Sequence, residues 1–232
     1  MKFQNRRRCN KKEHMKKLAI VLILAAAVFG QERFIKPVDD AMLDPTFLTF
    51  RTRLIAAIDR KDAKYVLSIV DPNIKNGFGG EDGIVKFRKG WKLESPKSEF
   101  WAEFSKVIKN GGSFNGEGRN KMNHFAAPYI FSNWPEDVDS FEHSVIFGSD
   151  VNLRKSPSTD TEIVSRLSHN IIQVVNDIPT SDGKTSEWVK IRTLGGLSGY
   201  VKSDFVRSST DYRAGFEKKR GVWKMTYFLA GD

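Results

Sequence analysis

The sequence VNLRKSPS at residues 151–158 begins a series of short apolar segments that continues to residue 208. Later members of the series include WVKI at residues 188–191 and GYV at residues 199–201. The segments are rich in β-branched or aromatic residues and are bounded by Ser, Asp, Gly or Pro, which is typical of the strands of a small barrel. The stretch 145–208 therefore predicts a compact β-barrel.

Alternation within the segments indicates which side chains are buried. Val189 and Ile191 flank Lys190, so one face of that strand is expected to lie in a core and the other in water. Gly199 has no Cβ and permits either a close approach of another backbone or a bend at a barrel corner. We expect no nucleophile–base pair within this stretch, so the chemistry it offers is recognition.

The order and spacing of these segments resemble the bacterial SH3-like domain of cell-envelope proteins. The matching opening element consists of Asn152, Leu153, Arg154, Pro157 and Ser158. The Trp-Val-Lys-Ile and Gly-Tyr-Val strands match as well, whereas the loop 176–187 is longer and more polar than the family needs. The resemblance implies a groove that binds cell-wall peptide or a partner protein.

Four residues are the candidate ligand contacts in this groove: Asn152, Arg154, Trp188 and Tyr200. The two aromatic residues suit a ligand surface because each has an apolar body and a polar end. The alternative is that these rings belong to the barrel core.

The N-terminus has the layout of a secretory signal. Eight basic residues and one acidic residue lie within 1–30, and the twelve residues 18–29 are all apolar. A small residue, Gly30, follows. Twelve residues are short for a membrane span, so we expect a signal peptide cleaved near Gly30 and a periplasmic or secreted protein without a stable span. The alternative is an uncleaved N-terminal anchor.

Charge and cysteine content narrow the class of protein. The net charge is +10, but outside residues 1–30 the chain carries 30 basic and 27 acidic residues. This near balance of charge does not predict a basic surface that binds nucleic acid. The single cysteine, Cys9, lies in the predicted signal, so the mature chain would have no disulfide and no thiolate site.

Helix signals dominate the residues between the signal and the barrel. Residues 31–43 look like a linker, and Asp44-Pro45 then begins a helix whose apolar stripe includes Phe47 and Leu54. Asp62 is expected to cap a second helix that ends at Asp71-Pro72, and a strand is expected at 74–78. Asp82 should cap a third helix and Ser95-Pro96 should open a fourth. The apolar run 125–131 contains Pro128, which favours an edge strand or a bulge.

The C-terminal residues complete the predicted architecture. Two β-rich runs, 212–217 and 222–229, flank a turn at Gly221 and predict a hairpin. An isolated hairpin is marginal in water, so it should pair with strands of the N-terminal half. The predicted fold is α+β: a host domain of 44–144 plus 209–232, with the barrel 145–208 inserted in it.

The host resembles, more weakly, the nuclear-transport-factor-2-like family. The resemblance rests on the helices of 53–70 and on the closing strand Gly-Val-Trp-Lys-Met at 221–225. It implies a curved sheet that wraps helices around a pocket. A small-molecule isomerase or hydrolase could use such a pocket, with Asp62, His124, Tyr129 and Asp232 as its acids and bases.

The other clusters of polar residues do not predict a functional site. His124, His143 and His169 lack the spacing of zinc ligands, so we expect no metal site and no cofactor. The acidic residues Glu136, Asp137, Asp139 and Glu142 do not match a Ca²⁺ loop and predict a solvated turn. The glycines at 79, 80 and 83 lack the order of a phosphate-binding loop.

Together these observations predict a secreted, non-enzymatic envelope protein whose SH3-like barrel binds cell-wall peptide or an envelope protein. The alternatives are the host-pocket enzyme and a purely structural module.

Overall fold

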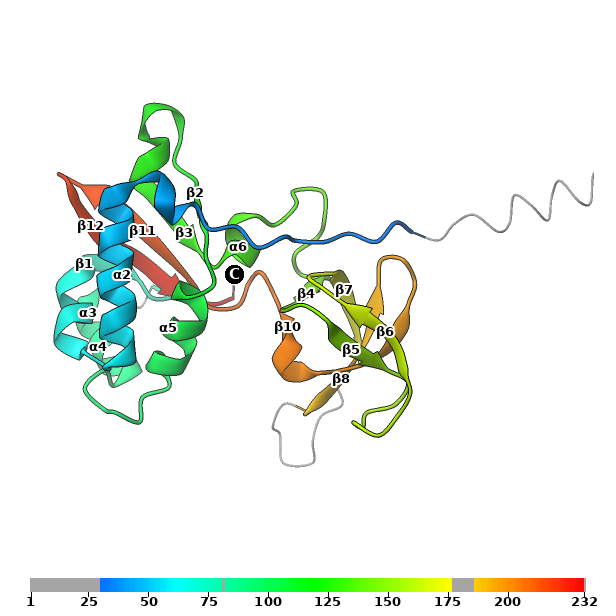
Figure 1. Cartoon of the computed structure of the whole chain (residues 1–232). Helices are drawn as coiled ribbons and strands as arrows, with labels where there is room; N and C mark the ends of the chain where they lie inside the picture. Colours follow the sequence, from blue (N-terminus) through cyan, green and yellow to red (C-terminus); the bar gives the residue numbers. More distant parts are fainter. Residues whose placement is uncertain (1–29, 81, 177–185, 232) are drawn as a thin grey trace, which may run out of the picture.

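A computed structural model describes residues 30–80, 82–176 and 186–231. The predicted signal, Asp232 and most of the loop 176–187 lie outside these described residues. The rest of the chain forms two sheets, each with its own core, in an α+β architecture (Figure 1).

The first sheet has five strands in the order β1-β12-β11-β3-β2. Its strands are β1 (Val70–Lys75), β2 (Ser113–Phe114), β3 (His124–Ala127), β11 (Arg213–Lys219) and β12 (Val222–Leu229). The β11–β12 hairpin lies in the middle, antiparallel to β3 on one side and parallel to β1 on the other. Strands from both halves of the chain therefore build one sheet around the C-terminal hairpin.

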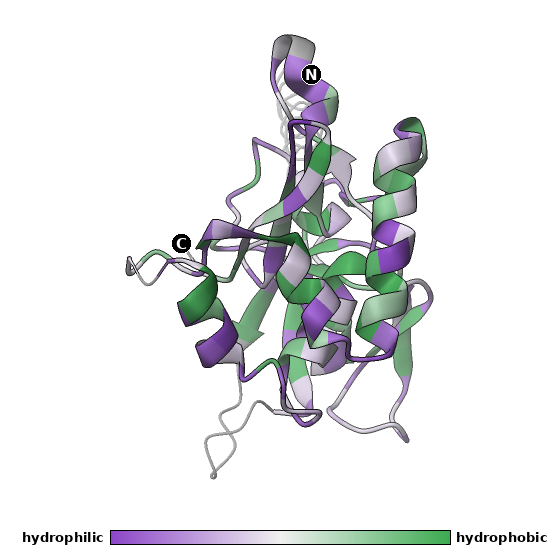
Figure 2. Cartoon of the chain, turned by 90° about the vertical axis from the view of Figure 1, so that its left-hand side faces the viewer, coloured by the Kyte–Doolittle hydropathy of each residue, from purple (hydrophilic) through white to green (hydrophobic). Residues whose placement is uncertain are grey.

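The helices of this unit are η1 (Asp40–Leu43), α2 (Pro45–Asp59), α3 (Ala63–Ile69), α4 (Ile84–Trp91), α5 (Phe100–Ile108), η2 (Gly118–Asn123) and α6 (Tyr129–Ser132). Helices α2, α3, α4 and α5 pack on one face of the sheet (Figure 1). Hydrophilic and hydrophobic residues alternate along the helices in Figure 2, as expected where one helix face is buried. The core beneath them is largely aromatic, with Phe47, Phe100, Phe104 and Phe228 fully buried.

Two of the predicted helix starts are confirmed. The Asp44 carboxylate accepts hydrogen bonds from the N–H groups of Thr46 and Phe47, at 2.7 and 3.1 Å. The Asp62 carboxylate accepts one from the Tyr65 N–H at 2.9 Å. Both caps satisfy N–H groups that have no partner within the helix.

Other boundaries differ from the sequence prediction. The strand expected at 74–78 is β1 at Val70–Lys75, and it contains Pro72 because β1 is an edge strand, where a missing N–H is tolerated. Asp82 does not cap α4. Its carboxylate instead binds Lys75 and the Asn76 N–H, while Gly83 at φ 98° occupies the cap position.

Two further predictions around proline were also wrong. Helix α5 begins at Phe100 rather than at Ser95-Pro96, because residues 95–98 form a turn in which the Ser98 N–H donates to the Ser95 carbonyl. Pro128 does not interrupt an edge strand. It follows β3, which lies between β11 and β2, and its carbonyl accepts from Phe131 at the start of α6.

The second sheet holds the strands predicted for 145–208. They are β4 (Ser144–Ile146), β5 (Val151–Arg154), β6 (Ile163–Leu167), β7 (Ile171–Asn176), β8 (Trp188–Thr193), β9 (Ser198–Lys202) and β10 (Val206–Arg207), in the order β10-β4-β7-β8-β9-β5-β6. The short helix η3 (Ser203–Phe205) precedes β10. One sheet encloses its own core of buried side chains, including Leu153 and Ile191, so it must curl on itself.

Residues 31–43, expected to be a plain linker, contact both units; we call 31–39 the strap. Phe34 bridges to Asn170 beside β7, and Asp39 bridges to Gly112 beside β2. Ile35 is buried in a third cluster with Tyr129, Val145 and other apolar side chains. The strap thus packs between the two sheets (Figure 1).

The end of the hairpin next to α2 and β1 makes stability depend on pH. Lys219 binds Asp71 at 2.9 Å, and this hydrogen bond, with one from the Asn73 N–H, lowers the pKa of the Asp71 carboxyl. A carboxyl with a lowered pKa in the folded state stabilises the fold above its unfolded pKa of about 3.9, and that contribution is lost as pH falls through the folded pKa.

We therefore expect the free energy of unfolding to fall below about pH 4, and to fall less in Asp71→Asn than in the wild type. Urea unfolding at pH 7 and pH 3 measures the difference. Asp160→Asn, in an exposed barrel loop, is the matched control and should behave as the wild type. An unchanged acid loss in Asp71→Asn would contradict the assignment.

Candidate ligand groove

Strands β5 and β8 of the barrel each have one buried face and one outer face. In β5, Val151 and Leu153 are buried, and Asn152 and Arg154 lie on the opposite face. Strand β8 repeats the pattern, with Val189 buried next to a half-buried Trp188. The alternation read from the sequence is therefore confirmed, and it directs the polar residues outward.

A groove of about 240 Å³ opens on this outer face. It is lined by Ser149, Asp150, Val151, Asn152, Arg154, Thr159, Trp188, Lys202 and Phe205. Three of the four predicted contacts, Asn152, Arg154 and Trp188, thus line one groove. They come from β5 and β8, which are brought together because β9 pairs with both.

Tyr200 is not among the groove-lining residues. Tyr200 is the cross-strand partner of Arg154 in β5 and of Lys190 in β8. It therefore lies on the same outer face, one cross-strand row away from the Trp188–Lys202 pair. Lys202, two residues further along β9 and directly opposite Trp188, lines the groove instead. Which residues share a row depends on strand register, which the sequence does not show.

The groove combines cations with aromatic rings. The Arg154 guanidinium donates to the Thr161 carbonyl at 2.8 Å, which leaves other donors available. The Lys202 ammonium lies 5.7 Å from the centre of the Trp188 ring and binds Glu187 at 2.9 Å. Such a site suits an extended chain that carries carboxylate groups and apolar surface.

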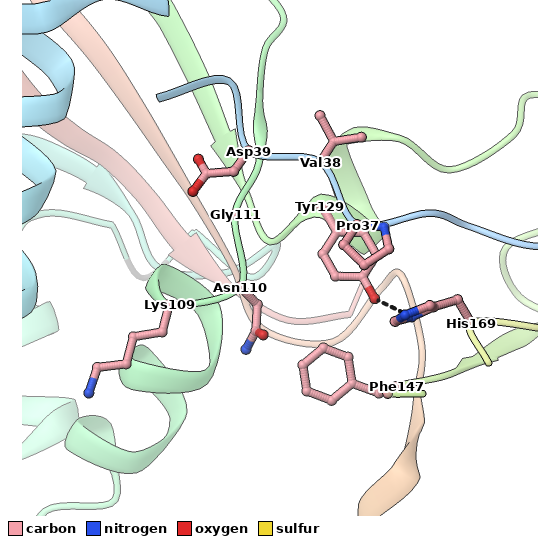
Figure 3. A pocket seen from close by; sticks show the side chains of 10 residues that line it. Pro37, Val38, Asp39, Lys109, Asn110, Gly111, Tyr129, Phe147 and His169 are labelled. Atoms are coloured by element: carbon pink, nitrogen blue, oxygen red, sulfur yellow. Dashed lines mark hydrogen bonds between the residues drawn. The ribbon is translucent and has the colours of Figure 1, made fainter. Parts of the chain in front are cut away.

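A second, larger cavity of about 420 Å³ lies where the strap, the host and the barrel meet (Figure 3). We call it the junction cavity. Its walls are Pro37, Val38, Asp39, Lys109, Asn110, Gly111, Tyr129, Phe147, Gly148 and His169. The Tyr129 hydroxyl and the His169 Nδ1 atom are 3.1 Å apart in a hydrogen bond, drawn as a dashed line in Figure 3. Burial raises the pKa of Tyr129 to about 12 and lowers the pKa of His169.

Sequence reasoning missed one contact at the border of the two cavities. The Nε2 atom of His169 lies 3.2 Å from the Ser149 hydroxyl, which lines the groove. Ser149, His169 and Tyr129 are 20 and 40 residues apart in the chain, so no local spacing signals their contact.

The residues suggested for a host-pocket enzyme lie in different places. Asp62 caps α3, Tyr129 lines the junction cavity, and His124 borders a separate surface hollow beside Tyr227. The space between the helices and the host sheet is filled by aromatic side chains, which are fully buried.

The remaining polar clusters have local roles. Asp137 forms a two-pronged ion pair with Arg33 of the strap, at 2.7 and 2.9 Å. The His143 ring contacts the Asp139 carbonyl at 2.9 Å. Among the described residues, no group of three or more His, Cys, Asp and Glu side chains is arranged to hold a metal ion.

The comparison with protein families agrees with the barrel. Residues 149–207 match the family described as the bacterial SH3 domain. The chain therefore carries a bacterial SH3 domain, as the resemblance of 145–208 implied. The likeness of the host to the nuclear-transport-factor-2-like family has no support from these comparisons.

No curated protein matches the chain. Within the part of the chain that the structure describes, no helix has the length and apolar character needed to cross a membrane.

Proposed function

We propose that the protein works outside the cytoplasm and uses the groove of its bacterial SH3 domain to bind cell-wall peptide. The observation that carries this proposal is the convergence of Arg154, Lys202 and Trp188 on one groove of that domain. Cell-wall peptides offer free carboxylates for the two cations and aliphatic stems for the ring. A signal-like N-terminus cleaved near Gly30 fits the same location.

The domain arrangement supports this role. In our proposal the host, 44–144 plus 209–232, carries the barrel as an insert. The junction core of the strap and Tyr129 fixes the barrel while the groove stays open to solvent. The alternative ligand for this groove is an envelope protein. The co-sedimentation experiment described next distinguishes it from cell-wall peptide.

Co-sedimentation of residues 30–232 with purified peptidoglycan, repeated across salt concentrations, tests the proposal. Retention that persists at high salt is the expected result. Retention that disappears with salt would indicate only a weakly basic surface, because screening removes exposed charge attraction. Absence of retention would contradict wall binding and would make a pull-down from envelope extract the next experiment.

Trp188→Ala is expected to weaken retention about tenfold or more, because aromatic anchors at the centre of a site carry a large share of binding energy. The bound fraction at a series of peptidoglycan concentrations measures the change. Phe141→Ala is the matched control, since Phe141 is 70% exposed and lies outside the groove. Equal losses in the two variants would remove Trp188 from the site.

A bracing role for the barrel is a second candidate function. It is favoured by the junction cluster, in which Ile35 of the strap packs with Val145 and Ile171 of the barrel. Deletion of 145–208 should then lower the thermal unfolding temperature of the host. An unchanged temperature would contradict bracing and leave the binding proposal intact.

A further inference from the structure

Three side chains form a continuous hydrogen-bonded chain from the groove into the junction cavity. Ser149 lies in the turn before β5 and lines the groove. Its hydroxyl is 3.2 Å from His169 Nε2, and His169 Nδ1 is 3.1 Å from the Tyr129 hydroxyl. A hydroxyl within reach of an imidazole that a third group orients is the geometry of an activated nucleophile.

The backbone holds the serine and the histidine together. The His169 N–H donates to the Gly148 carbonyl at 3.1 Å, and the Asp150 N–H donates to the Ser168 hydroxyl at 2.9 Å. Both neighbours of Ser149 are therefore tied to the turn that carries His169. The strap adds a third tie, since the Ile35 N–H donates to the His169 carbonyl at 2.9 Å.

Tyr129 and Ser149 differ in their exposure to solvent. Tyr129 is only 3% exposed, whereas Ser149 is exposed at the groove. Burial lowers the pKa of His169, which favours the neutral imidazole, the form that can accept a proton. The Asn152 amide lines the same groove, and in our proposal its N–H groups donate to a substrate oxygen.

We propose that Ser149 is a nucleophile for acyl transfer, with His169 as its general base and Tyr129 as the residue that positions the imidazole. The proposal rests on the proposed function in one respect, because the groove is where the acyl substrate, a peptide or its ester, binds. It departs from the expectation of a non-catalytic protein, which relied on sequence spacing alone.

The proposed acyl transfer uses only these side chains, the substrate and water. The Ser149 oxygen forms a bond to the carbonyl carbon, and its proton passes to His169 Nε2. The carbon–nitrogen or carbon–oxygen bond then breaks, and the leaving amine or alcohol takes the proton from Nε2. Water attacks the acyl-serine by the reverse use of the same base and regenerates the hydroxyl.

The relay requires one tautomer of His169. The proton must lie on Nδ1, where it is donated to the Tyr129 oxygen, so that the Nε2 lone pair faces the Ser149 hydroxyl. The opposite tautomer would make Nε2 a donor and would leave Ser149 unactivated. Tyr129 thus acts through His169 and does not contact the reacting atoms.

A fluorophosphonate probe tests the nucleophile on the purified protein. Attack by Ser149 forms an oxygen–phosphorus bond and expels fluoride, so intact mass should show a single adduct that peptide mapping places on Ser149. We expect no adduct in Ser149→Ala and labelling at least about 100-fold slower in His169→Asn, because a general base contributes about that much. Asparagine is the chosen replacement since it tolerates the φ of 57° at this position.

Ser156→Ala is the control and should label at the wild-type rate, because Ser156 is exposed in a loop outside the groove. Absence of an adduct on Ser149 in the wild type would overturn the proposal. Labelling that proceeds at the wild-type rate in His169→Asn would also overturn it, because the serine would then need no base.

The positioning role has a spectroscopic test. Nitrogen-15 shifts of the imidazole should show the Nδ1-protonated tautomer of His169 in the wild type and a change of tautomer in Tyr129→Phe. A wild-type ring protonated on Nε2 would refute the relay. Probe labelling needs no wall fragment, so loss of peptidoglycan retention with labelling intact would overturn only the binding proposal, and the reverse result only this one.

Discussion

Phe47→Ala is expected to lower the free energy of unfolding by about 3–5 kcal/mol, the usual cost of removing a buried phenylalanine. The ring is fully buried at the centre of the host core. It contacts five other aromatic rings, with centroids 4.1–5.8 Å away: Phe50, Phe114, Phe125, Phe216 and Trp223. These rings come from the helix, from β2 and β3, and from the hairpin.

The loss is large because several elements share the space left by the ring. Their backbones are fixed by pairing in the sheet, so the cavity cannot close fully. Urea unfolding monitored by tryptophan fluorescence measures the change. Leu48→Ala, at the next position and 39% exposed, is the control and should cost far less. A cost below about 1 kcal/mol for Phe47→Ala would mean that the core repacks freely.

Gly199→Ala is expected to destabilise the barrel by about 2–3 kcal/mol, because overpacking forces the backbone to shift. A Cβ at position 199 would lie 2.6 Å from the Arg154 carbonyl oxygen and 2.9 Å from Leu153 Cγ. The carbonyl belongs to the paired strand β5, so it cannot rotate away. The close backbone approach predicted from the sequence is therefore confirmed at this glycine.

The matched control is Gly90→Ala, which places the same methyl group where nothing lies within 4 Å. Gly90 is in helix α4, and alanine there should stabilise the fold by about 0.5–1 kcal/mol. Thermal unfolding of both variants measures the opposite signs. A neutral Gly199→Ala would show that β5 and β9 can separate without cost.

Local signals in the sequence predicted the elements well where one side chain decides the outcome. Asp44 and Asp62 cap their helices because a short carboxylate can reach the free N–H groups of its own chain. The barrel strands follow from short apolar segments that are bounded by turn residues, with clear alternation in β5 and β8. Asp82 failed as a cap because Lys75, seven residues earlier, competes for its carboxylate.

Partners distant in the chain could not be predicted in the same way. The sequence predicts Asn152, Arg154 and Trp188 as contacts of a ligand groove, and the structure places all three along one groove. Lys202 was missed and Tyr200 was placed one row away, because register depends on bulges and turns. The contact of Ser149 with His169 depends on how two turns of the barrel meet, which no period in the sequence encodes.

The strap gives the protein a defined response to mechanical load. A pull on the chain at residue 30 reaches the barrel, where the Ile171 N–H donates to the Arg33 carbonyl and the Ile35 N–H donates to the His169 carbonyl. The strap is also tied to the host, where the Arg33 guanidinium pairs with Asp137 and Asp39 bridges to Gly112. Tension along the N-terminus would therefore load the contacts of the strap with both units before it strained the aromatic core of the host.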